Sequence, residues 1–138
     1  MKIKKVMMAV ISERWRIILM KIWMDDERPA PDGYIQAYDV DGAIREIIRC
    51  KKETDYYWKE YIMGYMDRER FEMGFSVFNI EEVSCDNDLG EGTPEGYKLL
   101  EWLEATGYNV PIRIHSATPV ARARMQAIIE RNGWTEIK

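Results

Sequence analysis

The chain has little of several residue types, and each shortage argues against a class of protein. Its two cysteines, Cys50 and Cys85, show no CxxC spacing, so no zinc motif is expected and reduced thiols of a cytoplasmic protein are predicted. No apolar run approaches the roughly 20 residues of a membrane helix, so no membrane partner is expected. The net charge of -4 gives no overall attraction to nucleic acid.

What is present suits one globular domain. The 138 residues are 46% hydrophobic, enough for a real core. Residues 1–19 differ because basic residues flank a short apolar run, as in a secretory signal, but charges resume and no small-residue cleavage site follows. We predict an N-terminal extension over 1–19 and a domain over 20–138. A signal, an added strand and an interaction arm are the alternatives for 1–19.

One apolar run ends abruptly in two acids. Lys21-Ile22-Trp23-Met24 is followed by Asp25, Asp26 and then Pro29, which predicts a buried strand with two carboxylates at its C-terminal edge. Ligands of open parallel α/β sheets bind at that edge. Adjacent carboxylates repel each other, and a hard cation such as Mg²⁺ keeps them ionised.

Two further strands end in reactive side chains. A strand around Glu82–Cys85 leads into Asp86 and Asp88, and the strand Pro111–Ile114 leads into His115 and Ser116. If these strands are parallel neighbours of the first, all the groups share one edge of the sheet. Surface acids that merely follow strands are the alternative interpretation of the acidic clusters.

Each side chain at this edge has a chemical and a structural interpretation. Asp88, two residues after Asp86, suits acid–base chemistry or capping of its own loop. His115, the sole histidine, suits proton transfer or packing. Ser116 suits a phosphoryl contact or a hydroxyl-closed turn. The remaining candidates for binding phosphate, or for solvated surface charge, are arginines: Arg28, Arg122 and Arg124.

Periodicity and capping residues predict the other elements. Asp39 is the expected N-cap of a helix over 40–51, and Thr93 the N-cap of a helix that opens at Pro94 and ends at Gly107. The remaining expectations are a strand over 34–38, a last helix over 120–131 and a short final strand over 134–137.

Three separated blocks resemble the receiver domain of two-component response regulators, and most closely one divergent branch, the cyclic-phosphate processing receiver family of phages and bacteria. The blocks are WMDDERPAP, DNDLG and IHSATPVARARM, within about residues 20–131. The resemblance implies a receiver-like (flavodoxin-like) α/β fold, a three-layer sandwich with a mostly parallel sheet. It also implies Mg²⁺ (or Mn²⁺) held by Asp25, Asp26 and Asp86, with Asp86 at the phospho-acceptor position.

The chain departs from the family pattern at two places. Ordinary receivers carry a lysine at the end of a fifth strand, and here only the terminal Lys138 follows Ser116 in such a place. The branch usually has a histidine where this chain has Asn87. Relative to a minimal receiver, residues 52–75 form an aromatic-rich helical insertion. Its tyrosines Tyr57, Tyr61 and Tyr65 recur every four residues and predict a packing or homodimer face, or alternatively a lid or base-stacking platform.

The resemblance implies metal-dependent processing of a cyclic phosphate, either a 2',3'-cyclic RNA end or a cyclic nucleotide. His115 would be the acid or base at the departing ribose oxygen, with Asp86 and Asp88 as further catalytic candidates. Ser116, Arg28, Arg122 and Arg124 would bind the phosphate-containing small molecule or RNA end. The alternatives are a non-enzymatic degenerate receiver that binds Mg²⁺ and a partner, and a protein that sequesters a cyclic phosphate without cleaving it.

Overall fold

The computed structural model describes residues 16–62 and 76–138, with side chains over 19–52 and 79–138. The chain divides into two compact units: Met1–Leu19 with Arg49–Asn79, and Met20–Ile48 with Ile80–Lys138. The second unit contains every residue that the sequence predicts for the site. The elements are β1 (Arg16–Met24), β2 (Tyr34–Ala37), α2 (Val40–Ile62), β3 (Ser76–Cys85), α4 (Tyr97–Thr106), β4 (Ile112–Ile114), α5 (Pro119–Asn132) and β5 (Glu136–Ile137).

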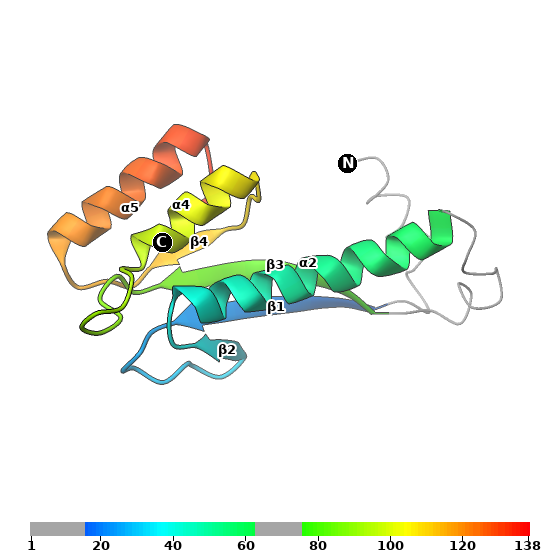
Figure 1. Ribbon diagram of the computed structural model, residues 1–138, viewed down its shortest axis with the longest axis horizontal. Helices are drawn as coiled ribbons and strands as arrows, with labels where there is room; N and C mark the ends of the chain where they lie inside the picture. The colour runs from blue at the N-terminus through cyan, green and yellow to red at the C-terminus, as the bar shows by residue number, and fades with distance from the viewer. Residues whose placement is uncertain (1–15, 63–75) are drawn as a thin grey trace. The chain divides into compact units, whose positions relative to one another are not determined.

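The five strands form one parallel sheet in the order β2-β1-β3-β4-β5 (Figure 1). Three helices of the described residues connect β2 to β3, β3 to β4 and β4 to β5. All three connections cross the sheet in the same direction, so right-handed crossovers place their helices against one face. The loop over 25–33 joins β1 to β2. The predicted receiver-like α/β fold is confirmed, and the described helices supply one helical layer of it.

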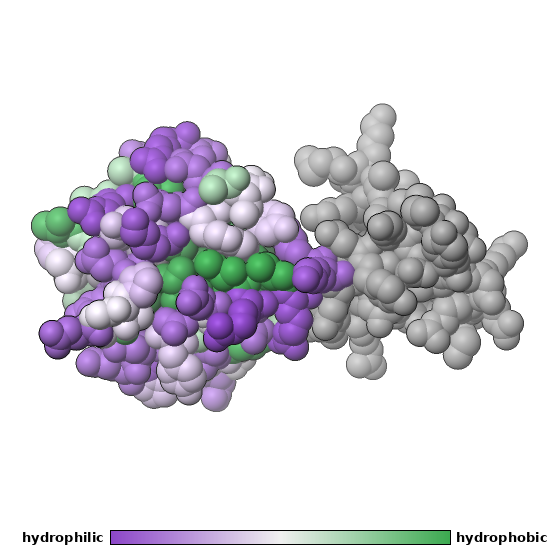
Figure 2. Space-filling view, viewed as in Figure 1, coloured by the Kyte–Doolittle hydropathy of each residue, from purple (hydrophilic) through white to green (hydrophobic). Residues whose placement is uncertain are grey.

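The two faces of the sheet differ because successive side chains of a strand point in opposite directions. One face, called the covered face, is apolar and buried; its residues are Ile22, Met24, Val83, Cys85, Ile112 and Ile114. The alternate positions form the polar face, made of Trp23, Tyr34, Glu82, Ser84 and Arg113. In Figure 2 the described surface is mostly hydrophilic, and an apolar strip follows the gap between α2 and α4.

Local chemistry explains most element boundaries. The Asp39 carboxylate accepts a hydrogen bond from the Gly42 N–H at 2.7 Å, which confirms Asp39 as the cap of α2. Gly107 and Gly133 end α4 and α5 in the left-handed conformation that glycine adopts without strain. The prediction that Thr93 caps a helix opening at Pro94 is wrong, because α4 begins at Tyr97.

Several predictions fall partly outside the described residues. β1 begins at Arg16, so the last four residues of the predicted extension over 1–19 belong to a strand, while 1–15 are not described. α2 runs on through Ile62 into the predicted insertion, whose remainder over 63–75 is not described. The homodimer and lid interpretations of 52–75 therefore stay predictions. Among the described residues, no helix is long and apolar enough to span a bilayer.

Candidate functional site

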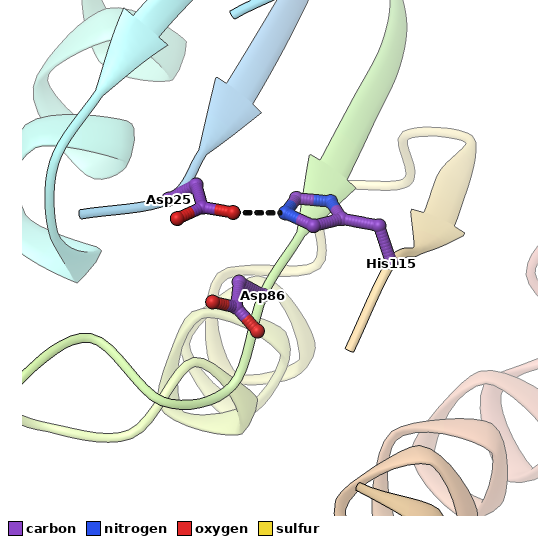
Figure 3. A group of neighbouring side chains, drawn as sticks. All are labelled: Asp25, Asp86 and His115. Atoms are coloured by element: carbon purple, nitrogen blue, oxygen red, sulfur yellow. Dashed lines mark hydrogen bonds and ion pairs between the residues drawn. The ribbon is translucent and has the colours of Figure 1, made fainter. Parts of the chain in front are cut away.

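Asp25, Asp86 and His115 stand at the same level of the sheet, because each is the first residue after its strand. The backbone N–H of Asp25 donates to the Ala37 carbonyl at 3.0 Å, that of Asp86 to Met24 and that of His115 to Cys85. These bonds continue the parallel ladder by one residue beyond β1, β3 and β4. Asp25, Asp86 and His115, three of the six groups predicted for the carboxyl edge, therefore meet there (Figure 3).

The same three residues continue the polar face. Asp25 lies two positions after Trp23, Asp86 two after Ser84, and His115 two after Arg113. Because side chains alternate along a strand, this spacing carries all three toward the side of the sheet opposite the covered face. The site thus lies at the end of the polar face, directly after three neighbouring strands.

Asp25 is a fully buried carboxylate whose two oxygens accept four hydrogen bonds. Oδ1 accepts from the backbone N–H groups of Glu27 and Arg28, both at 2.9 Å. Oδ2 accepts from Arg28 Nε and pairs with His115 Nε2, both at 3.0 Å. Burial alone would raise the pKa of Asp25, but these donors outweigh it and hold the pKa below the ordinary value. Asp25 therefore stays ionised at the centre of the site.

For Asp86, the effects that raise the carboxyl pKa outweigh those that lower it. Burial raises its pKa, the Asn87 backbone N–H at 2.9 Å offsets part of that, and the negative charges of Asp25 and Asp26 raise it further. Arg28 Nη2 lies 3.7 Å from Asp86 Oδ1 and 3.3 Å from the His115 carbonyl oxygen. A half-exposed guanidinium thus bridges the two acids, and the pKa of Asp86 stays raised because burial and the neighbouring carboxylates outweigh it.

The ring of His115 is held on three sides. Nε2 pairs with Asp25, Nδ1 lies 2.8 Å from Ser84 Oγ, and the Trp23 ring stacks on the imidazole at 3.9 Å between centroids and 4° between planes. Burial lowers the pKa of His115 and the Asp25 carboxylate raises it only partly. The ring is therefore mostly neutral near pH 7, with Nε2 directed at the acids.

The donor set suits a divalent cation. Side-chain ligand atoms of Asp25, Asp86 and His115 all lie within 4.8 Å of one another. Carboxylates are common ligands of divalent metals, and an added cation would offset the charges of Asp25 and Asp26, which raise the Asp86 pKa after burial does. Asp26, the third predicted ligand, lies outside this group, although its charge is felt at Asp86.

The remaining predicted residues lie around this centre with other contacts. Asp88 is exposed and its carboxylate accepts from the Gly90 N–H at 3.2 Å, the capping geometry. Ser116 is buried and its Oγ accepts from the Thr118 N–H at 3.4 Å. Arg122 donates to the carbonyls of Ile114 and Ser116, both at 3.2 Å.

Arg28 alone of the three predicted arginines contacts the acid cluster in the described structure. Arg124 lies over the Tyr97 ring at 4.5 Å and 3.7 Å from a Glu95 oxygen. Lys138 follows β5, and its ammonium group pairs with Glu136 at 3.1 Å. Arg28 is thus the residue best placed to meet an anion at the acids.

The loop after β3 is fixed from both ends. Asn87 Oδ1 accepts from the Tyr97 N–H at 3.1 Å, so Asn87 supplies the side-chain cap of α4 that was predicted at Thr93. The Gly96 N–H donates to the Asn87 carbonyl at 2.8 Å, and a Cβ on Gly96 would collide with the Asp86 carbonyl oxygen. Only glycine fits there, so the observed position of the Asp86 backbone requires glycine at position 96.

Sequence reasoning missed Ser84, Trp23 and Gly96. The first two carry a visible pattern, because Trp23/Asp25, Ser84/Asp86 and Arg113/His115 are all spaced by two residues at strand ends. Gly96 has no such pattern. Its role depends on a contact with a loop ten residues earlier in the chain.

The parallel sheet order and the acids at its carboxyl edge define a receiver-like α/β protein with a candidate metal centre. Residues 20–131 match the cyclic-phosphate processing receiver domain, and the chain belongs to that family. Searches among curated proteins and among solved structures found no match.

Proposed function

We propose that this protein carries out metal-dependent processing of cyclic phosphates, with 2',3'-cyclic RNA ends or cyclic nucleotides as substrates. The observation that supports the proposal is the meeting of Asp25, Asp86 and His115 at one sheet edge, in a chain whose family is described by cyclic-phosphate processing. Mg²⁺ or Mn²⁺ is the proposed metal, held by Asp25 and Asp86 with Asp26 beside them. When bound, the cation would polarise a phosphoryl oxygen and activate water.

The reaction is a hydrolysis. A water oxygen forms a bond to phosphorus, the bond from phosphorus to one ribose oxygen breaks, and a water proton ends on that ribose oxygen. His115 is the proposed acid or base for this transfer, because its Nε2 faces the acids and its side chain is one-tenth exposed. Asp88 is the second candidate for proton transfer, although its carboxylate also caps the loop.

Arg28 is the proposed contact for the phosphate. Its guanidinium already lies between Asp25 and Asp86, and its side chain is 52% exposed, so it has room to turn outward. Two hydrogen-bond donors in a fixed plane match two phosphate oxygens. Ser116 and the start of α5 lie close behind His115 in the sequence and are proposed to border the same anion.

The test is turnover of a substrate panel by the purified chain. The panel holds nucleoside 2',3'-cyclic monophosphates, 3',5'-cyclic nucleotides and an oligoribonucleotide with a 2',3'-cyclic end, each with Mg²⁺, Mn²⁺ or EDTA. We expect metal-dependent opening of a ring, followed by chromatography, with loss in Asp86→Asn. Glu130→Gln is the matched control, since Glu130 is an exposed acid near the far end of α5. Binding without turnover would favour the sequestering alternative, and neither binding nor turnover would favour the degenerate receiver.

A further inference from the structure

The hydroxyl group of Ser84 contacts Nδ1 of His115, the nitrogen that does not face Asp25. Its Oγ lies 2.8 Å from His115 Nδ1, on the ring edge away from Asp25. Ser84 is fully buried in β3 and belongs to the polar face. The contact joins β3 to the residue after β4, so neighbouring strands of the sheet set its geometry.

The donor and acceptor in each hydrogen bond between Asp25, His115 and Ser84 follow from which of these groups carries a proton. The Asp25 carboxylate accepts three hydrogen bonds from Glu27 and Arg28, so it also accepts from His115 and the ring proton lies on Nε2. A neutral imidazole then has no proton on Nδ1, and the Ser84 hydroxyl must donate there. If the proton moves to Nδ1, the same hydroxyl can turn and accept it, because a hydroxyl is both donor and acceptor.

Asp25, His115 and Ser84 have the composition of a nucleophilic triad, but burial assigns Ser84 a different role. A serine nucleophile must reach a substrate atom, and Ser84 has no exposed surface. Its hydroxyl faces the ring of His115. Ser84 can therefore act on a reaction only through the imidazole.

The stacking of Trp23 on His115 leaves one feature of the ring for Ser84 to determine, its flip state. Stacking at 3.9 Å with 4° between planes holds the plane of the imidazole, but it barely distinguishes the ring from its 180° flip. A flip exchanges Nδ1 with a carbon, so the Ser84 hydroxyl would lose its acceptor. When a metal or substrate competes for Asp25, Ser84 is the contact that keeps Nε2 directed at the acids.

We propose that Ser84 is a positioning residue for His115, which fixes the flip state of the imidazole for chemistry at Nε2. The inference rests on the proposed function, in which His115 transfers a proton. It adds a residue that touches neither metal nor substrate. Residues with this kind of contact behind an active histidine typically contribute roughly 10- to 100-fold to activity.

The test compares Ser84→Thr with Ser84→Val in the full chain. The two variants have nearly the same shape, and both suit a strand, but only threonine keeps the hydroxyl. Because His115 is the only histidine, ¹⁵N labelling of histidine gives one ring signal pair. We expect wild type and Ser84→Thr to show one fixed tautomer with the proton on Nε2. Ser84→Val should show ring signals shifted or broadened by exchange between the two flip states, because the hydroxyl that distinguishes them is gone.

Kinetics provide the second measurement. Ser84→Val should lose roughly 10- to 100-fold in kcat with little change in KM or in metal titration, and Ser84→Thr should recover most of that loss. If β-branched residues do not fit, Ser84→Ala replaces the valine variant and is compared with wild type. Ring shifts of Ser84→Val or Ser84→Ala that equal those of wild type would overturn the proposal. A wild type that turns over no cyclic phosphate overturns the proposed function instead, and the ring spectra still decide the role of Ser84.

Discussion

The two faces of the one sheet follow different rules. On the covered face, side chains such as Ile22, Val83 and Ile112 have no exposed surface and make the core. On the polar face, neighbouring positions of the same strands form directional contacts. Trp23 meets the Tyr34 ring edge-on at 5.7 Å and stacks on His115, and Glu82 pairs with Arg113 at 3.0 Å and accepts a hydrogen bond from the Tyr34 hydroxyl.

This difference explains the origin of the site. Apolar packing gains free energy from area and tolerates sideways shifts, whereas hydrogen bonds and ring stacking require fixed positions. The covered face therefore supplies the core, the backbone ladder sets the level of the strands, and the polar face sets the orientation of Asp25 and His115. Changes at individual positions of the polar face should therefore show which of its groups serve stability and which serve chemistry.

The largest expected effect is on chemistry alone. His115→Ala should lower turnover by roughly 10²- to 10⁴-fold, because it removes the proposed proton carrier while leaving the covered face intact. Stopped-time assays on the best substrate of the panel measure it, with Glu130→Gln as control. An alanine variant with wild-type turnover would reduce His115 to packing against Trp23.

The two central acids should respond to amide substitution with opposite signs. The folded-state pKa of Asp25 lies below its ordinary value of 3.8, so its charge stabilises the fold above that pH, and the contribution is lost as pH falls through the folded pKa. Asp25→Asn should cost about 1.5–3 kcal/mol at pH 7.

The pKa of Asp86 is raised, so ionisation of Asp86 opposes folding as pH rises above its ordinary value. Asp86→Asn should therefore be more stable than wild type at pH 7 in EDTA, with the gain disappearing at acid pH. Urea unfolding at several pH values measures both variants. Destabilisation of the same size in both would show that the acids are equivalent, contrary to their hydrogen bonding.

Gly96→Ala should destabilise the protein by about 1–3 kcal/mol, because its Cβ meets the Asp86 carbonyl oxygen of a packed loop. The change should also weaken metal binding by moving Asp86. Gly92→Ala is a control for glycine removal in the same loop, where a Cβ meets nothing within 4 Å but the backbone φ of +75° is itself unfavourable. Equal losses in both variants would assign the Gly96 effect to backbone freedom instead of contact.

The smallest effect is expected on the polar face away from the acids. Glu82→Gln should cost about 0.5–1 kcal/mol, since the Arg113 partner is partly exposed and the amide still accepts hydrogen bonds. The side-chain pKa of Glu82 is lowered, so the difference from wild type should shrink as pH falls through that pKa. Turnover should not change; a large loss would mean that the whole polar face acts as one unit.

The sequence predicts the fold well where the boundary of a strand or helix depends only on residues close to it in the chain. The run ending in Asp25, the cap at Asp39 and the helix end at Gly107 depend on near neighbours, and the structure places them as expected. The start of α4 is missed, because Asn87 caps it from ten residues earlier, at the beginning of the same loop. β3 is longer than the predicted Glu82–Cys85, since its earlier residues do not show a simple apolar run.

The site is predictable in its residues and less so in their contacts. Strand-end position is enough to bring Asp25, Asp86 and His115 together. The partners of each group come from side chains on other elements, such as Ser84 on Nδ1 and Arg28 across two acids. Arg122 illustrates the limit, because its helical position suits phosphate while its side chain binds the Ile114 and Ser116 carbonyls.

The central claim is that the acids at the sheet edge bind one divalent cation. Titration calorimetry of wild type and Asp86→Asn with Mn²⁺, then with Mg²⁺, tests it most directly, with Glu130→Gln as the matched acid-to-amide control. The account predicts one site per chain in wild type and Glu130→Gln, and an affinity at least roughly 10-fold weaker in Asp86→Asn. Equal affinity in all three proteins would contradict it.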